Sequence, residues 1–250
     1  MALQAVLLDM DGTLVDTEPY WIAAEYRLVE EHGGLWSDEH AHTLVGNALL
    51  SSAVYLREHG GVDLDPPVIV ERLLDDVVLA TEAAIPWRPG ALALLAELAE
   101  AQLPCAMVTM SYERLAGVVC AQLPAGTFTT VVTGDQVRHG KPHPEAYLTA
   151  AARLGVDPAH CVAIEDSPTG LASAEAAGCV VVAVPHAVPI SAALTRVLVG
   201  SLEELSLARL DALVRDRLPR PTQPTPRQPP RPTSQRVEHS SPSEPTRPAR

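Results

Sequence analysis

Five short runs of apolar residues recur along the chain, and none of them alternates with polar positions. Uninterrupted apolar runs of this length are typical of strands that are buried on both faces, as in a parallel sheet. The pattern therefore predicts at least five parallel strands. They lie at residues 5–11, 105–110, 130–134, 161–166 and 180–185.

Stretches with helical spacing of apolar residues separate the later runs. An alternation of strands and helices is typical of a doubly wound α/β fold, so we predict a Rossmann-like parallel sheet. Residues 196–205 add a short strand and a closing helix to this prediction. The other predicted helices lie at residues 91–101, 112–122, 144–154 and 168–177.

The first and second predicted strands are separated by residues 12–104, which is far longer than a loop in a compact domain. Amphipathic stretches at 17–33, 49–59 and 67–84 fill most of this interval. We therefore predict that residues 17–88 form an inserted α-helical cap domain. The core domain then consists of residues 1–16 and 89–218, with Pro86, Pro89 and Gly90 marking the return of the chain.

Residues 219–250 differ in composition from the rest of the chain. They hold ten prolines and six arginines but only two glutamates, with almost no apolar side chains. Such a segment cannot bury enough apolar surface to offset the entropy of ordering it. We predict a disordered, proline- and arginine-rich C-terminal tail that the core does not need for folding.

Charge and hydropathy exclude several classes of protein. The net charge of −13 argues against a nucleic acid or an anionic membrane surface as partner. The sequence has no apolar run long enough for a membrane span, and its N-terminus lacks the basic segment of a signal peptide. The four cysteines show no metal or disulfide spacing, so we expect a cytoplasmic protein.

Polar side chains stand at the ends of three predicted strands. In open α/β sheets the carboxyl ends of the strands meet at one edge, where ligands bind. Carboxylates beside an ammonium group and hydroxyls are typical of a site for a divalent metal ion and a phosphate group. The ammonium group belongs to the only lysine of the chain, Lys141. The strand-end residues are Asp9, Asp11, Thr109, Ser111, Glu165, Asp166 and Ser167. Ser167 precedes Pro168, so a helix N-cap is the alternative for this residue.

Four segments resemble, in order and spacing, the four motifs of the haloacid dehalogenase superfamily. They are DMDGTLVDTE, VTMS, GKPHPEAY and IEDSPTGLASAEAAG, and the resemblance covers residues 3–210. The chain is most similar to the β-phosphoglucomutase-like branch, whose members carry a helical cap after the first motif. The resemblance implies a small phosphorylated metabolite as substrate and Mg²⁺ as cofactor.

The resemblance also implies roles for individual residues. Asp9 would be the nucleophile, because a carboxylate that takes the phosphoryl group divides one difficult transfer into two easier ones. Asp11 would be the general acid and base. Mg²⁺ would be held by Asp9, the backbone carbonyl of Asp11, and Asp166. Glu165 and Ser167 would support the site. The phosphate-binding residues would be Gly12, Thr13, Thr109, Met110 and Lys141.

Sister activities within the superfamily leave several alternatives. Asp11 argues against a dehalogenase, and the single lysine argues against a phosphonate hydrolase that needs a lysine in the cap. Mutases carry a histidine where this chain has Trp21 and an arginine where it has VGNALL. A phosphatase is therefore favoured over a mutase, and a non-catalytic regulatory module of the same fold is the alternative from another class.

Substrate choice is expected to depend on the cap and on few of its residues. Candidates for the face over the site are Glu18, Tyr20, Trp21, Gly46 and Asn47, although both aromatic residues also suit the cap core. Four histidines without metal-binding spacing are expected to be solvated: His32, His40, His42 and His59. His143 is expected to order the loop around Lys141. We expect a monomer, with a dimer as the alternative.

Overall fold

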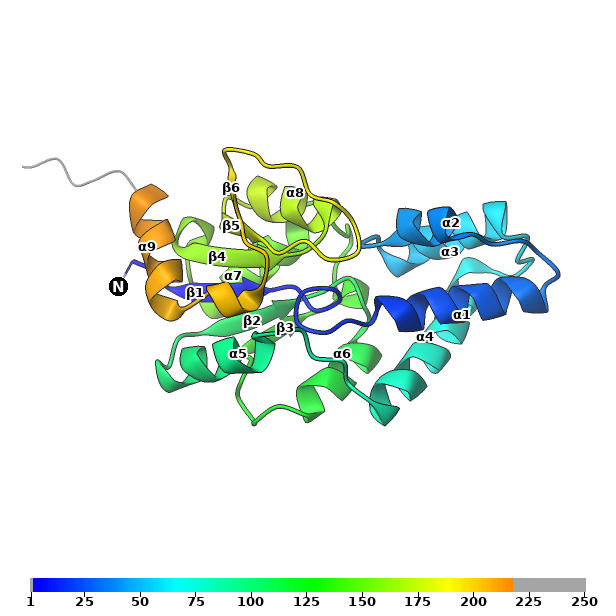
Figure 1. Cartoon of the computed structure of the whole chain (residues 1–250), viewed down its shortest axis with the longest axis horizontal. Coiled ribbons are helices and arrows are strands. Elements are labelled where there is room, and N and C mark those ends of the chain that lie inside the picture. The colour runs from blue at the N-terminus through cyan, green and yellow to red at the C-terminus, as the bar shows by residue number, and fades with distance from the viewer. Residues whose placement is uncertain (1, 218–250) are drawn as a thin grey trace, which may run out of the picture. The chain divides into compact units, whose positions relative to one another are not determined.

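The computed structural model describes residues 2–217, and the predicted tail at 219–250 lies outside them. Its centre is a parallel sheet of six strands in the order β3-β2-β1-β4-β5-β6 (Figure 1). This confirms the predicted doubly wound fold. The strands are β1 (Ala5–Leu8), β2 (Cys105–Val108), β3 (Thr130–Val132), β4 (Cys161–Glu165), β5 (Val180–Ala183) and β6 (Arg196–Leu198).

Successive side chains of a strand point to opposite faces, and the sheet uses this alternation to build two cores. Val6 and Leu8 pack with α5 (Ala91–Glu100), α6 (Glu113–Ala121) and α9 (Leu207–Arg217) on one face. Ala5 and Leu7 pack with α7 (Glu145–Leu154) and α8 (Pro168–Ala176) on the other. Because both faces are covered, the four central strands β2, β1, β4 and β5 are apolar at every position except Glu165.

Leu7 offers a direct test of this packing. Its side chain is fully buried in the core formed with α7 and α8, so Leu7→Ala is expected to lower the free energy of unfolding by about 2–5 kcal/mol. Urea unfolding followed by circular dichroism measures the change. Leu92→Ala, at a half-exposed position on α5, should change stability by less than about 1 kcal/mol. Equal effects at both positions would contradict the assignment of Leu7 to the core.

Four helices occupy the interval between β1 and α5, at one end of the sheet (Figure 1). They are α1 (Glu18–Glu31), α2 (Asp38–Leu44), α3 (Leu49–His59) and α4 (Pro66–Ala83). Helix α4 packs against α1, α3 and the core helix α6. The sequence pattern predicts three of these helices. It omits α2, because only Ala41 and Leu44 of its seven residues are buried.

The two connections between the helical insertion and the core run side by side. Asp16 N–H donates to Pro86 O at 2.8 Å, and Arg88 N–H donates to Leu14 O at 2.9 Å. Between them Val15 and Trp87 form an antiparallel bridge. The chain therefore leaves and re-enters the core at one place, close to the return predicted at Pro86.

The end of the described chain corrects one expectation. The segment after β6 forms a single 3₁₀ turn, Leu202–Glu204, instead of the closing helix predicted within 196–205. The closing helix is α9, which buries Leu210, Asp211 and Val214. Its many charged residues explain why the apolar pattern of the sequence did not predict this helix. Within residues 2–217, no helix is both long enough and apolar enough to span a membrane.

Candidate active site

The strand-end residues converge, as predicted, at the carboxyl edge of the sheet. Asp9 follows β1 directly, and its N–H donates to Ile164 O of β4 at 3.0 Å. A cavity of about 60 Å³ lies over this edge, with core residues on one side and α1–α4 on the other. The core residues that line it are Asp9, Asp11, Thr109, Met110, Ser111, Lys141, Asp166 and Ser167.

Lys141 is the central cation of the site. Its Nζ donates to Asp9 Oδ1 at 2.7 Å, to Glu165 Oε1 at 2.5 Å and to Val108 O at 2.9 Å. Its side chain is 2% exposed. Burial alone would lower the pKa of Lys141, but the ion pairs with Asp9 and Glu165 raise the pKa above its ordinary value. Lys141 therefore stays charged and holds Asp9 in place.

Glu165 is fully buried and serves as a support for the lysine. Its Oε1 also accepts a hydrogen bond from Tyr147 OH at 2.8 Å, and its Oε2 accepts from Ser167 Oγ at 3.2 Å. Tyr147 belongs to α7 and was not predicted as a site residue. Its position in an apolar stretch gives no sign of this role. Gly170 makes the arrangement possible, since a Cβ there would collide with the Glu165 carboxylate.

The Asp11 carboxylate is held by three hydroxyl donors and one indole N–H. Oδ2 accepts from Thr109 Oγ1 at 3.0 Å and from Ser111 Oγ at 2.8 Å. Oδ1 accepts from Thr17 Oγ1 at 2.5 Å and from Trp21 Nε1 at 3.4 Å. Thr17 was missed because a threonine before a helix is an ordinary N-cap, yet in this structure its hydroxyl contacts Asp11 instead.

Two buried carboxylate oxygens, Asp9 Oδ2 and Asp166 Oδ2, have no hydrogen-bond partner among the described residues. Oxygens of Asp9, Glu165 and Asp166 all lie within 4.8 Å of one another. Burial and then the charge of Glu165 raise the pKa of Asp9 to about 7, and burial and then Asp9 raise the pKa of Asp166 as well. An excess of buried negative charge with unsatisfied oxygens fits a divalent cation.

The turn after Asp9 brings backbone close to these carboxylates. Gly12 has a φ of +82°, and a Cβ at this position would collide with the Asp166 carboxylate. Not every predicted phosphate-binding amide is free, however. Gly12 N–H donates to Val15 O and Thr109 N–H donates to Val132 O. Across residues 2–217, no hydrogen bond uses the N–H of Thr13 or of Met110.

Ser167 is the N-cap of α8, which was the alternative to a role in the site. Its Oγ accepts a hydrogen bond from Gly170 N–H at 3.1 Å, so it caps the N-terminus of α8. The same hydroxyl donates to Glu165, as described above. Ser167 therefore supports the site through its cap and its contact with Glu165.

Most of the predicted cap residues line the cavity. Glu18, Trp21, Gly46 and Asn47 do so, whereas Tyr20 does not and donates its hydroxyl to Ala84 O at 3.1 Å. Burial, followed by the charge of Asp11, raises the pKa of Glu18 to about 8. The cavity wall also contains Glu25, Ser52 and Leu73, which the sequence patterns did not single out.

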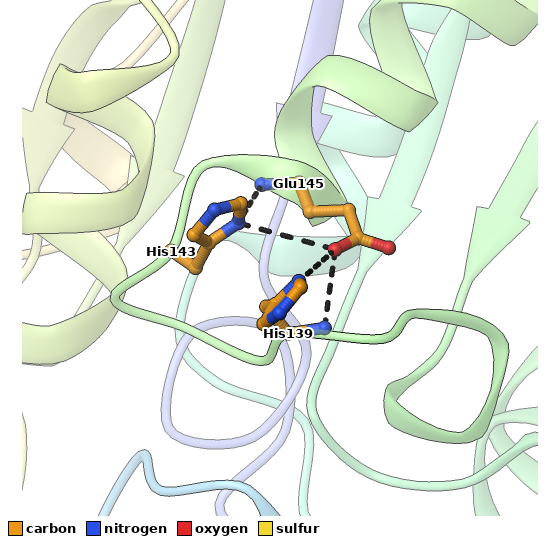
Figure 2. A group of neighbouring side chains, drawn as sticks. All are labelled: His139, His143 and Glu145. Atoms are coloured by element: carbon orange, nitrogen blue, oxygen red, sulfur yellow. Dashed lines mark hydrogen bonds and ion pairs between the residues drawn. The ribbon is translucent and has the colours of Figure 1, made fainter.

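His139 and His143, which stand two residues before and after Lys141 in the sequence, lie beside Glu145 (Figure 2). Glu145 accepts from His139 N–H at 3.1 Å and contacts the His139 ring at 2.9 Å. Arg138 N–H donates to the second oxygen of Glu145 at 2.8 Å, and Glu145 N–H donates to His143 Nδ1 at 3.3 Å. His143 thus contacts the loop backbone, in line with the expected loop-ordering role. These contacts explain why His139, His143 and Glu145 lie close together, without the need for a bound ligand.

Comparison with known proteins assigns the family. A model of the haloacid dehalogenase-like hydrolases matches residues 3–178. The chain belongs to this family. Hexitol phosphatase A of Escherichia coli K12 is 37% identical to this hydrolase over 187 residues, covering 74% of this chain and 84% of the relative. The fructose-1-phosphate phosphatase YqaB of the same strain is 34% identical over 175 residues, covering 69% and 92%.

Solved structures agree with the fold of this haloacid dehalogenase-like hydrolase. CbbY from Rhodobacter sphaeroides, in complex with phosphate, has a TM-score of 0.75 and 30% identity over 84% of this chain and 99% of that one. A β-phosphoglucomutase from Clostridium difficile has a TM-score of 0.76 and covers 86% of this chain and 98% of its own, but is 20% identical, so it supports the fold alone.

Proposed function

We propose that this hydrolase is a Mg²⁺-dependent phosphatase that acts on a small phosphomonoester, such as a sugar phosphate, through an aspartyl-phosphate intermediate. The observation that carries the proposal is the state of Asp9. One of its oxygens is held by Lys141 and the other lacks a partner within the described chain, with the Asp11 carboxylate on the same cavity wall. The hexitol and fructose-1-phosphate phosphatases among its relatives support the same reaction class.

The reaction would proceed in two steps at this site. A carboxylate oxygen of Asp9 attacks phosphorus, the bond from phosphorus to the ester oxygen breaks, and protonated Asp11 gives its proton to the leaving alcohol. Water then attacks the phosphorus of the aspartyl phosphate while Asp11 takes the proton of that water. The bond to Asp9 breaks, which releases phosphate and restores the enzyme. Thr17, Thr109 and Ser111 keep the Asp11 carboxylate in position for both proton transfers.

Mg²⁺ fits the acidic part of the site. Asp9 and Asp166 would hold it through their unpartnered oxygens, together with the backbone carbonyl of Asp11, and Glu165 would support it from behind Lys141. When bound, the ion offsets the repulsion between the carboxylates and an incoming phosphate dianion. For the phosphate itself, we propose that Lys141 acts together with the N–H groups of Thr13 and Met110, with Thr109 holding Asp11 nearby.

A phosphatase explains the surroundings of Asp11 better than a mutase does. Trp21 places its indole N–H at 3.4 Å from Asp11 Oδ1, and an indole can donate a hydrogen bond but cannot exchange a proton at neutral pH. The loop between α2 and α3, at residues 45–48, contains no arginine to grip a second phosphate. Water is then the available acceptor. The intact set of Asp9, Asp11, Lys141 and Asp166 argues against a non-catalytic regulatory module.

The cavity also indicates how the substrate is admitted. At about 60 Å³ it is well below the ~300–1,000 Å³ that is usual for small-molecule sites, so the cap helices have to move away from the core before a sugar phosphate can bind. Glu18, Trp21 and Asn47 would then contact the substrate as the cap closes. Tyr20 would instead hold the start of α1 to the chain that follows α4, through its hydrogen bond to Ala84 O. We further propose a cytoplasmic monomer.

Metal removal tests the proposal. With a panel of phosphate esters, release of inorganic phosphate is expected to require Mg²⁺ and to fall by at least about 100-fold in excess chelator. Added Mg²⁺ should restore the rate and raise the temperature of unfolding, because the ion binds the folded protein. Asp166→Asn should lose the stabilisation by Mg²⁺. Undiminished activity in excess chelator would contradict a metal-dependent phosphatase.

A further inference from the structure

A buried carboxylate in the cap has no role in the chemistry described above. Glu25 lies on α1, and its side chain shares a helix face with Glu18 and Trp21, since positions 18, 21 and 25 are three and four residues apart. It is 5% exposed and lines the same cavity as Asp9 and Asp11. Glu25 lies one helical turn after Trp21, the residue of α1 that contacts Asp11.

Glu25 is held in a defined orientation by one neighbour. Trp36 Nε1 donates to Glu25 Oε2 at 3.1 Å. The Trp36 ring is itself fixed, because it stacks on His40 with ring centroids 4.8 Å apart and meets the edge of Tyr55 at 6.0 Å. The other oxygen of Glu25, Oε1, has no hydrogen-bond partner within residues 2–217. One oxygen is therefore anchored, and the other has no protein partner in a residue that lines the cavity.

The contact with Trp36 is the only hydrogen bond of the Glu25 side chain among residues 2–217, and it leaves the charge of a carboxylate unpaired. The cavity lining contains a single cation, Lys141, which is already bound to Asp9 and Glu165. A buried carboxylate without a cation is unfavourable, and an apolar side chain would pack there at lower free energy. Burial raises the pKa of Glu25 to about 8, so at neutral pH it is largely a neutral acid that can both donate and accept a hydrogen bond.

We infer that Glu25 is a specificity-determining residue that binds a hydroxyl group of the organic part of the substrate, so that the preferred substrates are polyhydroxylated phosphomonoesters. Ser52 and Asn47 line the same wall and supply neutral polar groups suited to further hydroxyls. A site that pairs with hydroxyls rejects compounds without them, since its buried polar groups are then left unpaired. The inference rests on the proposed phosphatase function.

Two substrates and three variants test it. Sorbitol 6-phosphate carries a chain of hydroxyls, whereas p-nitrophenyl phosphate carries none. Glu25→Leu is expected to lower kcat/KM for sorbitol 6-phosphate by about 10–100-fold and to change it for p-nitrophenyl phosphate by less than about 3-fold. Glu25→Gln, which keeps a donor and an acceptor, should retain most of the activity on both. Glu30→Leu, at an exposed position of the same helix, is the matched control.

Stability gives a second readout. If Glu25 is kept for substrate recognition, Glu25→Leu should unfold close to the wild-type temperature, because removal of a buried carboxylate offsets the loss of the acceptor for Trp36. If Glu25 is kept for structure, the same variant should be less stable and lose activity equally on both substrates, which would overturn the inference. Where Glu25→Leu does not fold, Glu25→Met carries the same comparison, and failure of both to fold also overturns it.

The remaining outcomes separate this inference from the function on which it rests. Equal losses in Glu25→Gln and Glu25→Leu would show that a negative charge is needed, which contradicts binding of hydroxyls by a neutral acid. A wild-type enzyme that hydrolyses p-nitrophenyl phosphate but discriminates against sorbitol 6-phosphate would overturn the substrate class while leaving the phosphatase intact. Hydrolysis of neither ester, nor of any other in the panel, would contradict the phosphatase itself.

Discussion

Asp9→Asn is expected to abolish turnover, with a loss of at least about 10⁴-fold, while the protein stays folded. An amide keeps the shape of the carboxylate and can still contact Lys141 through its oxygen, but it is not a nucleophile toward phosphorus. The rate of phosphate release from the best ester of the panel measures the loss. Rapid acid quenching with labelled substrate should trap a phosphorylated protein in the wild type and none in the variant.

The control for this experiment is a change of the same kind outside the site. Asp63→Asn, at an exposed position before α4, should retain full activity and the phosphorylated intermediate. An active Asp9→Asn enzyme would mean that another group attacks phosphorus. A labelled intermediate in the variant would lead to the same conclusion.

Lys141→Ala is expected to lower kcat by about two to three orders of magnitude, and Lys141→Arg should restore only part of it. The Nζ atom is a compact charge that reaches Asp9, Glu165 and Val108 O at once from a position with 2% exposure of the side chain. A guanidinium group is planar and wide, so it cannot occupy the same point without displacing one of these partners. The attraction between the Lys141 ammonium group and the transferring phosphoryl group grows in the transition state. The loss in Lys141→Ala should therefore appear in kcat more than in KM.

Arg138→Ala provides the comparison, because Arg138 is a basic and exposed residue in the same loop. It should be as active as the wild type. Wild-type turnover in Lys141→Ala would remove this residue from the active site. Full rescue by Lys141→Arg would show that charge alone matters and that the three-way contact geometry does not.

The core of the fold could be predicted from the sequence because the four central strands are buried on both faces. Their apolar runs, such as the one at residues 105–108, therefore contain no competing polar pattern. The amphipathic pattern at residues 49–59 likewise predicted both ends of α3, Leu49–His59. Helix α2 is short and mostly exposed, so its stability depends on neighbours that a local pattern does not reveal. Helix α9 was missed for another reason: its charged residues outnumber its buried residues, so the sequence shows no clear apolar face.

The acidic residues of the site could be predicted because the carboxyl ends of parallel strands meet, which brings residues as distant as Asp11 and Asp166 onto one cavity. Residues positioned by tertiary contact could not. Tyr147 is buried in α7 and resembles any core aromatic until Glu165 is found beside its hydroxyl. Glu25 resembles any polar position on a helix surface until α2 and α3 enclose it.

The position of helices α1–α4 between β1 and β2 in the chain affects the order in which the protein can fold during synthesis. Helices α1–α4 follow one another between Glu18 and Ala83, whereas β1 pairs with β2 and β4, with Ala5 opposite Cys161. During synthesis, which proceeds from the N-terminus, these helices can form their local contacts before either partner of β1 leaves the ribosome. The apolar residues of β1 therefore wait first for β2, at residues 105–108, and then for β4, at residues 161–165. Asp9 reaches its place only when β4 has joined the centre of the sheet.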